Sequence, residues 1–311
     1  MRELWTEKYR PKTIDGYVFR DEEQKKQVAA WVKEKAIPHL LFSGAAGTGK
    51  TTLAKILINQ VGVDDFDVKE INASRETGVE HVRQVIEGFV QTMPFGDFKV
   101  VLLDEADYLS QNAQATLRNL METYHSSARF ILTCNYPNKI IPALHSRCQG
   151  FHIDRLDQVE FTARVAEVLV TEGIDVDIET LDTYVKATYP DLRKCLNLVQ
   201  MNSTSGKLVK PHGDEGGSAD YRIDVVELFK TGKYTKGREL LCSSVRAEEM
   251  EGIYRWMYDN LTLWGNTEEQ QDAAILAIRD GLVSHSLVAD VEINLSATLV
   301  KLAMIAKQGT E

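Results

Sequence analysis

Long apolar runs are absent from this sequence of 311 residues, in which no stretch approaches the roughly 20 apolar residues that span a bilayer. The first residues, Met1–Trp5, also lack the apolar core of a secretory signal peptide. We therefore expect a cytoplasmic protein without a membrane partner.

Cysteines are few and widely spaced. The four are Cys134, Cys148, Cys195 and Cys242, and none belongs to a C-x-x-C pair. This spacing argues against both a zinc site and a disulfide framework, so we expect reduced thiols.

Positive charge is also scarce, because 36 Lys and Arg stand against 46 Asp and Glu and give a formal net charge of −10. This balance argues against non-specific binding of nucleic acid by the whole surface, but it allows a local basic face. The hydrophobic content of 43% is that of an ordinary globular protein. The length is sufficient for two or three domains.

Strand-like and helix-like segments alternate up to about residue 153. The apolar segments are His39–Ser43, Val68–Asn72, Lys99–Asp104, Phe130–Asn135 and Phe151–Ile153. This alternation predicts an α/β fold in which helices cover both faces of a parallel sheet. The pattern is purely helical over 156–201, rich in Gly and Ser over 202–220, and helical again from 221 to the end.

A phosphate-binding loop of the form G-x-x-x-x-G-K-T follows the first predicted strand and opens a helix. Its glycines, Gly44, Gly47 and Gly49, allow backbone N–H groups to surround an anion at the positive end of the helix dipole. Lys50 can reach the β- and γ-phosphates, and the Thr51 hydroxyl can hold Mg²⁺. The loop predicts a nucleoside triphosphate as ligand.

Two carboxylates end the apolar strand Val100–Leu103. Because the carboxyl ends of parallel strands share one edge of the sheet, they should lie beside the phosphate loop. We assign Asp104 to Mg²⁺ and Glu105 to the attacking water. Asn135 ends another strand, where it either orients that water or contacts the γ-phosphate, or serves only as a turn former.

The order of these motifs, with S-R-C at 146–148, resembles that of AAA+ ATPases of the clamp-loader group. The segment Trp5–Ile14 (WTEKYRPKTI) is similar to the preamble of replication factor C small subunits, and Val68–Arg83 and Gln114–Tyr124 also resemble that family. Val288–Ala306 is similar to the large clamp-loader subunit of T-even-type phages. The resemblance implies an AAA+ ATPase domain over 1–153, a helical lid over 154–204, a linker over 205–220 and an all-α collar over 221–311.

The resemblance also implies roles in binding and hydrolysing ATP. Thr6–Tyr9 and Val18 would surround the adenine, and Arg193 would reach the nucleotide from the lid. The complete nucleotide-binding set is Thr6, Glu7, Lys8, Tyr9, Val18, Gly44, Gly47, Thr48, Gly49, Lys50, Thr51, Thr52 and Arg193, and the catalytic set is Lys50, Asp104, Glu105, Asn135 and Arg147. Thr51 and Asp104 would hold the metal.

Two of the implied roles would make ATP hydrolysis depend on DNA and on a neighbouring subunit. Asn72 matches a position that holds the catalytic glutamate in an inactive pose until DNA is present. Arg147 matches an arginine finger, which acts on ATP held by a neighbouring subunit. Its guanidinium would stabilise charge that develops on the γ-phosphoryl oxygens.

Contacts with DNA and with a clamp are likewise implied. Residues 110–125 read as a helix capped by Ser110, with Gln111, Gln114 and Arg118 on a polar face and an apolar stripe opposite. The resemblance assigns Arg75, Arg83, Gln114 and Arg118 to DNA, and Val90, Met93 and Phe95 to an apolar plug for a sliding clamp. The alternatives are ordinary solvation for the polar face and a place in the core for the plug.

These observations predict an ATPase subunit of a clamp loader in DNA replication, with ATP and Mg²⁺ as cofactors. The expected partners are the sliding clamp, a small loader subunit, other copies of this chain, primer-template DNA and the DNA polymerase holoenzyme. The phage resemblance points to a viral protein in the host cytoplasm. Two alternatives remain, namely a AAA+ motor that translocates on DNA or remodels complexes, and a non-catalytic structural subunit.

Overall fold

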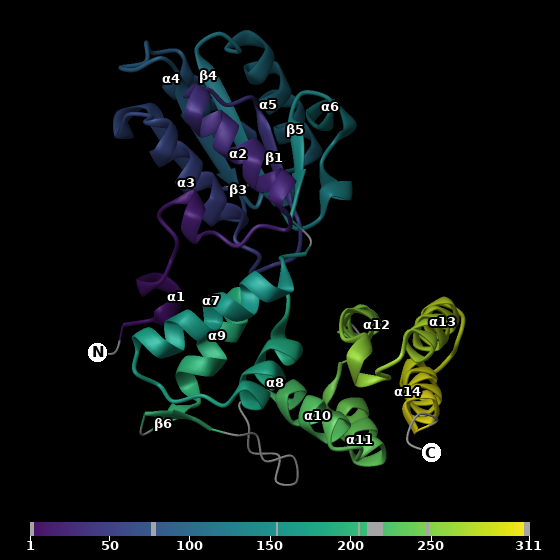
Figure 1. The fold of residues 1–311 in the computed structure, drawn as a ribbon. Helices are drawn as coiled ribbons and strands as arrows, with labels where there is room; N and C mark the ends of the chain where they lie inside the picture. Colours follow the sequence, from purple (N-terminus) through teal and green to yellow (C-terminus); the bar gives the residue numbers. More distant parts are fainter. Residues whose placement is uncertain are drawn as a thin grey trace. The chain divides into compact units, whose positions relative to one another are not determined.

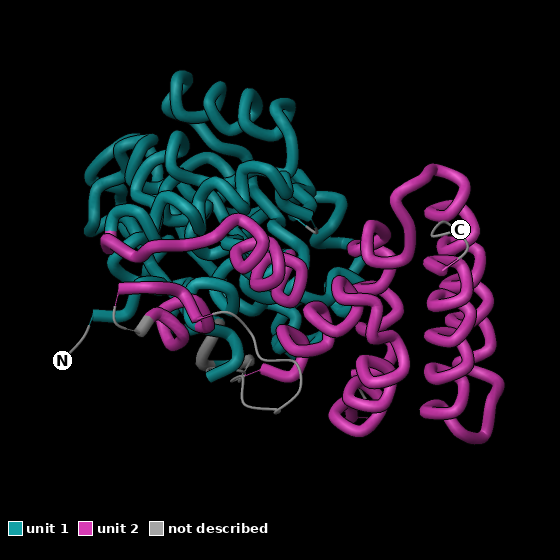
Figure 2. Tube along the Cα trace, turned by 60° about the horizontal axis from the view of Figure 1, so that its bottom comes forward, with its two compact units in different colours: residues 1–171, 190–197 teal, residues 172–189, 198–311 magenta. Residues whose placement is uncertain are grey.

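A computed structural model describes residues 3–75, 79–153, 155–204, 206–209, 220–246 and 249–307. The chain divides into two compact units, one of residues 1–171 and 190–197 and the other of residues 172–189 and 198–311 (Figure 2). Most of the predicted linker, at 205 and 210–219, lies outside the described residues. The boundaries of the lid and the collar stay a prediction.

The first unit is built on a five-stranded parallel sheet in the order β2-β3-β4-β1-β5 (Figure 1). The strands are β1 (Leu40–Ser43), β2 (Val68–Asn72), β3 (Lys99–Asp104), β4 (Ala128–Cys134) and β5 (Gln149–His152). The inner strands are almost continuously apolar, as expected where both faces of a parallel sheet are covered. The predicted α/β fold class is confirmed.

Helices cover both faces of this sheet. Successive side chains of a strand point to opposite faces, so each strand contributes to two separate packing layers. On one face, Leu41 and Leu103 belong to a core with Ile86 of α4 (Val79–Val90) and Leu117 of α5 (Gln111–Thr123). On the other face, the ring of Phe42 packs against that of Phe151. Phe151 in turn contacts Trp31 of α2 (Glu22–Glu34). The nucleotide-binding loop leaves β1 at the carboxyl edge of this layered core.

The residues at the starts of two helices are of types that favour these positions. Ser110 accepts a hydrogen bond from Ala113 N at the start of α5, which confirms the predicted cap. Gly49 precedes α3 (Lys50–Val61) with a φ of 87°, a conformation that favours glycine. The remaining helices of this unit are α1 (Trp5–Lys8), α6 (Pro142–His145), α7 (Gln158–Thr171) and the start of α9 (Leu192–Met201).

The second unit is mainly helical. Its helices are α8 (Ile178–Thr188), the end of α9, α10 (Tyr221–Lys230), α11 (Tyr234–Ser244), α12 (Met250–Asp259), α13 (Glu268–His285) and α14 (Val291–Lys307), beside a short antiparallel pair of β6 (Ser203–Thr204) and β7 (Lys207–Leu208).

In this unit, the aromatic residues Tyr254, Trp256 and Trp264 are buried. The indole of Trp256 donates to Lys186 O at 2.8 Å, and that of Trp264 donates to Met257 O at 3.0 Å. These aromatic residues are therefore part of the core of the second unit. Within the described residues, no helix is both long and apolar enough to cross a membrane.

Candidate nucleotide site

The phosphate loop positions Lys50 at a polar cavity of about 280 Å³. The Lys50 ammonium donates to Gly44 O at 3.0 Å and to Ala45 O at 2.7 Å. Burial lowers the pKa of Lys50, while the nearby carboxylates of Asp104 and Asp107 act in the opposite direction. A polyphosphate in this cavity would meet a desolvated cation, whose attraction for an anion is stronger than in water.

Asp104 and Thr51 meet at the carboxyl end of β3. The Thr51 hydroxyl donates to Asp104 Oδ1 at 2.6 Å, and both residues line the cavity. A hydroxyl and a carboxylate are hard oxygen ligands, which Mg²⁺ uses together with substrate phosphates. The donor set therefore fits the predicted metal, and Thr51 and Asp104 are the residues that would hold it.

Thr133 is a site residue that the sequence analysis missed. Its hydroxyl donates to Asp104 Oδ1 at 2.5 Å and accepts a hydrogen bond from Glu105 N at 3.0 Å. Glu105 has a φ of 59°, a left-handed conformation that is uncommon outside glycine. Thr133 thus connects the Asp104 carboxylate to the backbone of Glu105. A polar residue inside the apolar run Phe130–Cys134 was the available signal.

Two asparagines line the same cavity, at the ends of β2 and β4, the strands on either side of β3. Asp107, a buried carboxylate, accepts hydrogen bonds from Asn135 N at 3.3 Å and from Tyr136 N at 3.2 Å. These bonds fix the backbone that presents the Asn135 side chain. Asn72 Oδ1 accepts from both the backbone N–H and the hydroxyl of Ser74, at 2.9 and 2.6 Å. The structure therefore brings Lys50, Thr51, Asp104, Glu105 and Asn135 together around one cavity.

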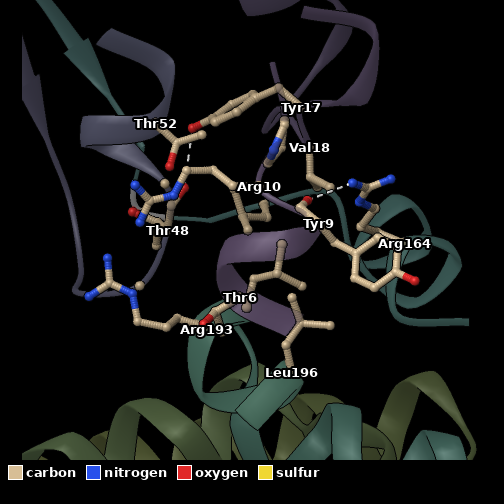
Figure 3. Close-up of a pocket in the computed structure, with 15 residues that line it drawn as sticks. Thr6, Tyr9, Arg10, Tyr17, Val18, Thr48, Thr52, Arg164, Arg193 and Leu196 are labelled. Carbon is tan, nitrogen blue, oxygen red and sulfur yellow. Dashed lines mark hydrogen bonds between the residues drawn. The ribbon is translucent and has the colours of Figure 1, made fainter. Parts of the chain in front are cut away.

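A second cavity lies beside the loop and carries aromatic and apolar walls (Figure 3). Of the predicted nucleotide-binding residues, it is lined by Thr6, Tyr9, Val18, Gly47, Thr48, Gly49, Thr52 and Arg193. Glu7 and Lys8 are not among its lining residues. Glu7 instead pairs with Arg10 at 2.9 Å. Gly44 lines neither cavity, although its carbonyl holds Lys50.

Tyr17 and Arg164 also line this cavity and were not predicted (Figure 3). The Tyr17 hydroxyl donates to Thr48 O at 3.2 Å, and burial raises the pKa of Tyr17 above its ordinary value. Arg164 donates to Tyr9 O at 2.8 Å and so holds the segment that follows α1. An aromatic wall, an apolar floor and fixed polar groups are the features of a site for a flat heterocycle.

The start of α9 lies directly against the phosphate loop. A Cβ at Gly47, whose φ is 75°, would lie 1.8 Å from Asp191 Oδ1. Asp191 Oδ1 also accepts a hydrogen bond from Lys194 N at 2.8 Å. Burial raises the pKa of Asp191, although hydrogen bonds and the charges of Arg193 and Lys194 oppose that effect. Arg193 lines both cavities, so the turn at 191–193 joins the two parts of the site.

Arg147 does not line either cavity of its own chain. It follows α6, where its guanidinium forms an ion pair with Glu122 and donates to Ala143 O at 2.8 Å. Its separation from the cavities within one chain is compatible with the predicted action on a neighbouring subunit.

Of the predicted DNA-binding residues, Arg75 and Arg83 are exposed, Arg118 is half-buried and one residue is buried. Arg83 pairs with Glu87 at 3.3 Å, and Arg118 donates to Asn119 Oδ1 at 2.7 Å. Gln114 is only 1% exposed. The expectation that Gln114 lies on an open polar face is therefore wrong, because its amide is taken up by hydrogen bonds inside the protein.

The predicted clamp-binding residues divide in the same way. Met93 is 87% exposed and Phe95 is 79% exposed. Val90 is 2% exposed and belongs to the core between α4 and the sheet. The prediction of Val90 as a contact residue is therefore wrong, since its side chain already packs against the core.

Comparisons with known proteins agree with this geometry. Residues 40–154 match the model of the ATPase family associated with various cellular activities (AAA). The replication factor C small subunit of Saccharolobus solfataricus is 36% identical over 97% of this chain and 94% of its own length. That of Sulfurisphaera tokodaii is 34% identical over 98% and 96%, and that of Archaeoglobus fulgidus is 39% identical over 77% of each chain.

A solved structure shares the fold. The RuvB Holliday junction branch migration motor of Thermotoga maritima superposes with a TM-score of 0.57 over 97% of this chain and 91% of its own. Its sequence identity is 14%, so the likeness concerns the architecture alone.

Proposed function

Because this chain belongs to the family of replication factor C small subunits, we propose that it is an ATPase subunit of a sliding-clamp loader in DNA replication. The proposal rests on the cavity that is lined by Lys50, Thr51, Asp104 and Glu105. It brings a phosphate-binding cation, oxygen ligands for Mg²⁺ and a carboxylate for the attacking water to one place. A structural subunit without activity would not need this complete set.

The proposed reaction is hydrolysis of the γ-phosphoryl group of ATP. The loop and Lys50 would bind the β- and γ-phosphates, and the Tyr17-lined cavity would hold the base. Mg²⁺, when bound by Thr51 and Asp104, would neutralise charge on the phosphates. Glu105 would accept the proton of the attacking water, and Asn135 would orient that water or the γ-phosphate. Arg193 would contact the phosphates from the start of α9.

The finer proposals concern assembly and DNA. Copies of this chain would assemble with a smaller subunit, so that Arg147 of one copy completes the site of the next. Primer-template DNA would contact Arg75, Arg83 and Arg118 through its phosphates, which positions DNA without reading its sequence. ATP would favour the clamp-bound state, and DNA would trigger hydrolysis and release. Association with the polymerase holoenzyme, and a viral origin with action in the host cytoplasm, belong to the same proposal.

The test is the ATPase rate of the purified chain with its partner subunit. We expect a low rate alone and a clear increase when primer-template DNA and clamp are added together. Glu105→Gln should still bind ATP but lose about 100-fold or more in turnover, the usual contribution of a general base. A rate that responds to duplex DNA without clamp, accompanied by strand displacement, would instead support a motor.

A further inference from the structure

The second unit carries a cavity of about 740 Å³, which we call the α10–α14 groove. One wall comes from the end of α10 and the turn that leads into α11, through Phe229, Lys230 and Tyr234. Another wall comes from the segment between α12 and α13 and from the last turn of α14. The groove is thus bordered by elements that lie far apart in the sequence.

Packing and hydrogen bonds fix these walls. Phe229 is 2% exposed, and its ring centroid lies 5.0 Å from that of Trp264 and 6.1 Å from that of Tyr234. Gln270 Nε2 donates to Ile305 O at 3.2 Å, which joins the start of α13 to the end of α14. The groove is therefore arranged before a ligand binds, which reduces the entropy lost on binding.

The groove is positively charged, in contrast to the net charge of −10 of the whole chain. Among its described lining residues, Lys186, Lys230 and Lys307 are basic and none is acidic. Lys186 and Lys230 both pair with Asp182, at 2.9 and 2.8 Å, so one carboxylate holds two ammonium groups. The two lysine side chains are only 16% and 23% exposed, and a partly desolvated cation attracts an anion more strongly than one in water. An anionic ligand would neutralise the excess positive charge.

The walls favour a peptide over a nucleic acid. Single-stranded nucleic acids stack their bases on exposed aromatic faces, but the ring of Phe229 is already covered by its aromatic neighbours. A cavity of this size encloses a compact ligand rather than an extended phosphate backbone. Phe229, Leu263 and Ala306 give it an apolar part. Thr262 and Asn266 are exposed lining residues that can form hydrogen bonds with a peptide backbone.

We propose that the α10–α14 groove binds an acidic peptide segment of a partner protein. Carboxylates of the peptide would pair with the ammonium groups of Lys230 and Lys307, and an apolar side chain would lie against Phe229. This binding and ATP hydrolysis would be separate activities. The groove is lined by residues of the second unit, whereas both nucleotide cavities are lined by residues of the first.

The experiment measures binding of the labelled full chain to an array of short peptides that combine Asp and Glu with apolar residues. A matched array carries Asn and Gln at the acidic positions. We expect the best acidic peptides to bind about ten-fold or more tightly than their neutral counterparts at low salt, and this preference to shrink at high salt.

Three variants locate the binding. Lys307→Glu should weaken binding of the acidic peptides about ten-fold or more, because it reverses a charge of the groove. Lys301→Glu makes the same change at an exposed residue of α14 that does not line the groove, so it is the matched control and should bind like the wild type. Thr262→Trp should also weaken binding about ten-fold or more, because the larger side chain would fill part of the groove.

Each other outcome would overturn the proposal. A wild-type chain that binds acidic peptides no better than neutral ones would exclude a role for the lysines. Equal affinities of Lys307→Glu and Lys301→Glu, or wild-type affinity in Thr262→Trp, would place the peptide elsewhere.

Two further measurements test other occupants of the groove. Labelled oligothymidylate that binds the wild type more tightly than the peptides do, and is lost in Thr262→Trp, would assign the groove to nucleic acid. Self-association that is lost in Thr262→Trp, measured by sedimentation, would assign it to a second copy of this chain. Circular dichroism checks the fold of each variant, and the ATPase rate of the isolated chain should stay unchanged in all three.

Discussion

At the scale of single residues, Thr133 holds the Asp104 carboxylate and the backbone of Glu105. Its hydroxyl accepts from Glu105 N and donates to Asp104, so it fixes a left-handed backbone next to the proposed metal ligand. Thr133→Val keeps the shape of the side chain and removes both bonds. We expect turnover to fall about 10- to 100-fold, since small displacements of reacting groups have effects of that size.

Thr133→Ser is the matched control, because it keeps the hydroxyl. It should retain most of the DNA-stimulated rate, whereas both variants should bind a fluorescent ATP analogue nearly as well as the wild type. Equal rates in Thr133→Val and the wild type would mean that the bridge does not position Glu105.

His39 provides a prediction about pH. Burial, with added repulsion from Arg129 and His125, lowers the pKa of His39 from its ordinary value of 6.5 to about 4. The neutral ring accepts a hydrogen bond from Phe130 N at 3.1 Å. Because the unfolded chain binds a proton below pH 6.5 and the folded chain does so only near pH 4, stability falls as the pH drops between these values. From pH 7 to pH 5 the loss should be about 2 kcal/mol.

Urea unfolding at the two pH values measures this loss. His39→Asn keeps an acceptor near the position of Nδ1 but does not titrate, so it should lose about 2 kcal/mol less than the wild type over the same interval. An identical pH dependence in both proteins would assign the acid sensitivity to other groups.

The sequence identified those site residues whose chemistry is carried by a local motif. Lys50, Thr51, Asp104 and Glu105 follow from a loop and a strand end that can be recognised without any tertiary contact. Val90 shows the limit of this approach, because an apolar residue before a strand reads equally well as core or as an exposed plug. Only the packing of α4 against the sheet distinguishes the two.

At the scale of elements, Gln114 links α5 to the segment before α6. Its amide donates to Leu109 O and Lys139 O, both at 3.0 Å, and accepts from Ile141 N at 2.8 Å. Gln114→Leu would leave three backbone groups, in buried or partly buried positions, without their partner. We expect a loss of about 3 kcal/mol in the free energy of unfolding, because unsatisfied buried groups are costly.

Gln111→Leu on the same helix is the control, since Gln111 is exposed, and it should change stability by less than about 0.5 kcal/mol. Urea denaturation of both variants compares the two positions. Equal stability of the two variants would show that the buried amide is dispensable.

The first and last residues of a strand could be predicted where the sequence changes from apolar to polar at its ends. β2 and β3 begin and end where the apolar pattern does. β4 begins at Ala128 and β5 at Gln149, each two residues before the predicted start. Ala128 pairs with Lys99 and Gln149 with Leu40, so neighbouring strands rather than local hydrophobicity set these starts. The partners of Gln114 could not be predicted for the same reason. Lys139 and Ile141 follow β4, and the sequence does not show that the chain returns there to the start of α5.

At the scale of the whole molecule, Arg147 and Glu105 serve different sites in the proposed assembly. Within one chain, Arg147 pairs with Glu122 and lines neither cavity. An arginine that acts on a neighbouring subunit must exchange this partner for the γ-phosphate of that neighbour. Arg147→Ala should therefore leave the low rate of the isolated chain unchanged and lower the DNA-stimulated rate of the assembly about 10³-fold.

Mixed assemblies test whether the arginine acts between subunits. Assemblies of Arg147→Ala alone or of Glu105→Gln alone should be inactive. In an equal mixture, an Arg147→Ala subunit supplies Glu105 while an adjacent Glu105→Gln subunit supplies Arg147, so about a quarter of the sites between copies should recover. The control is a mixture of Arg147→Ala with the double variant Glu105→Gln/Arg147→Ala. Neither of these subunits carries Arg147, so no site should recover. If Arg147 served its own subunit, no mixture would regain activity, because every subunit would still lack one of the two groups.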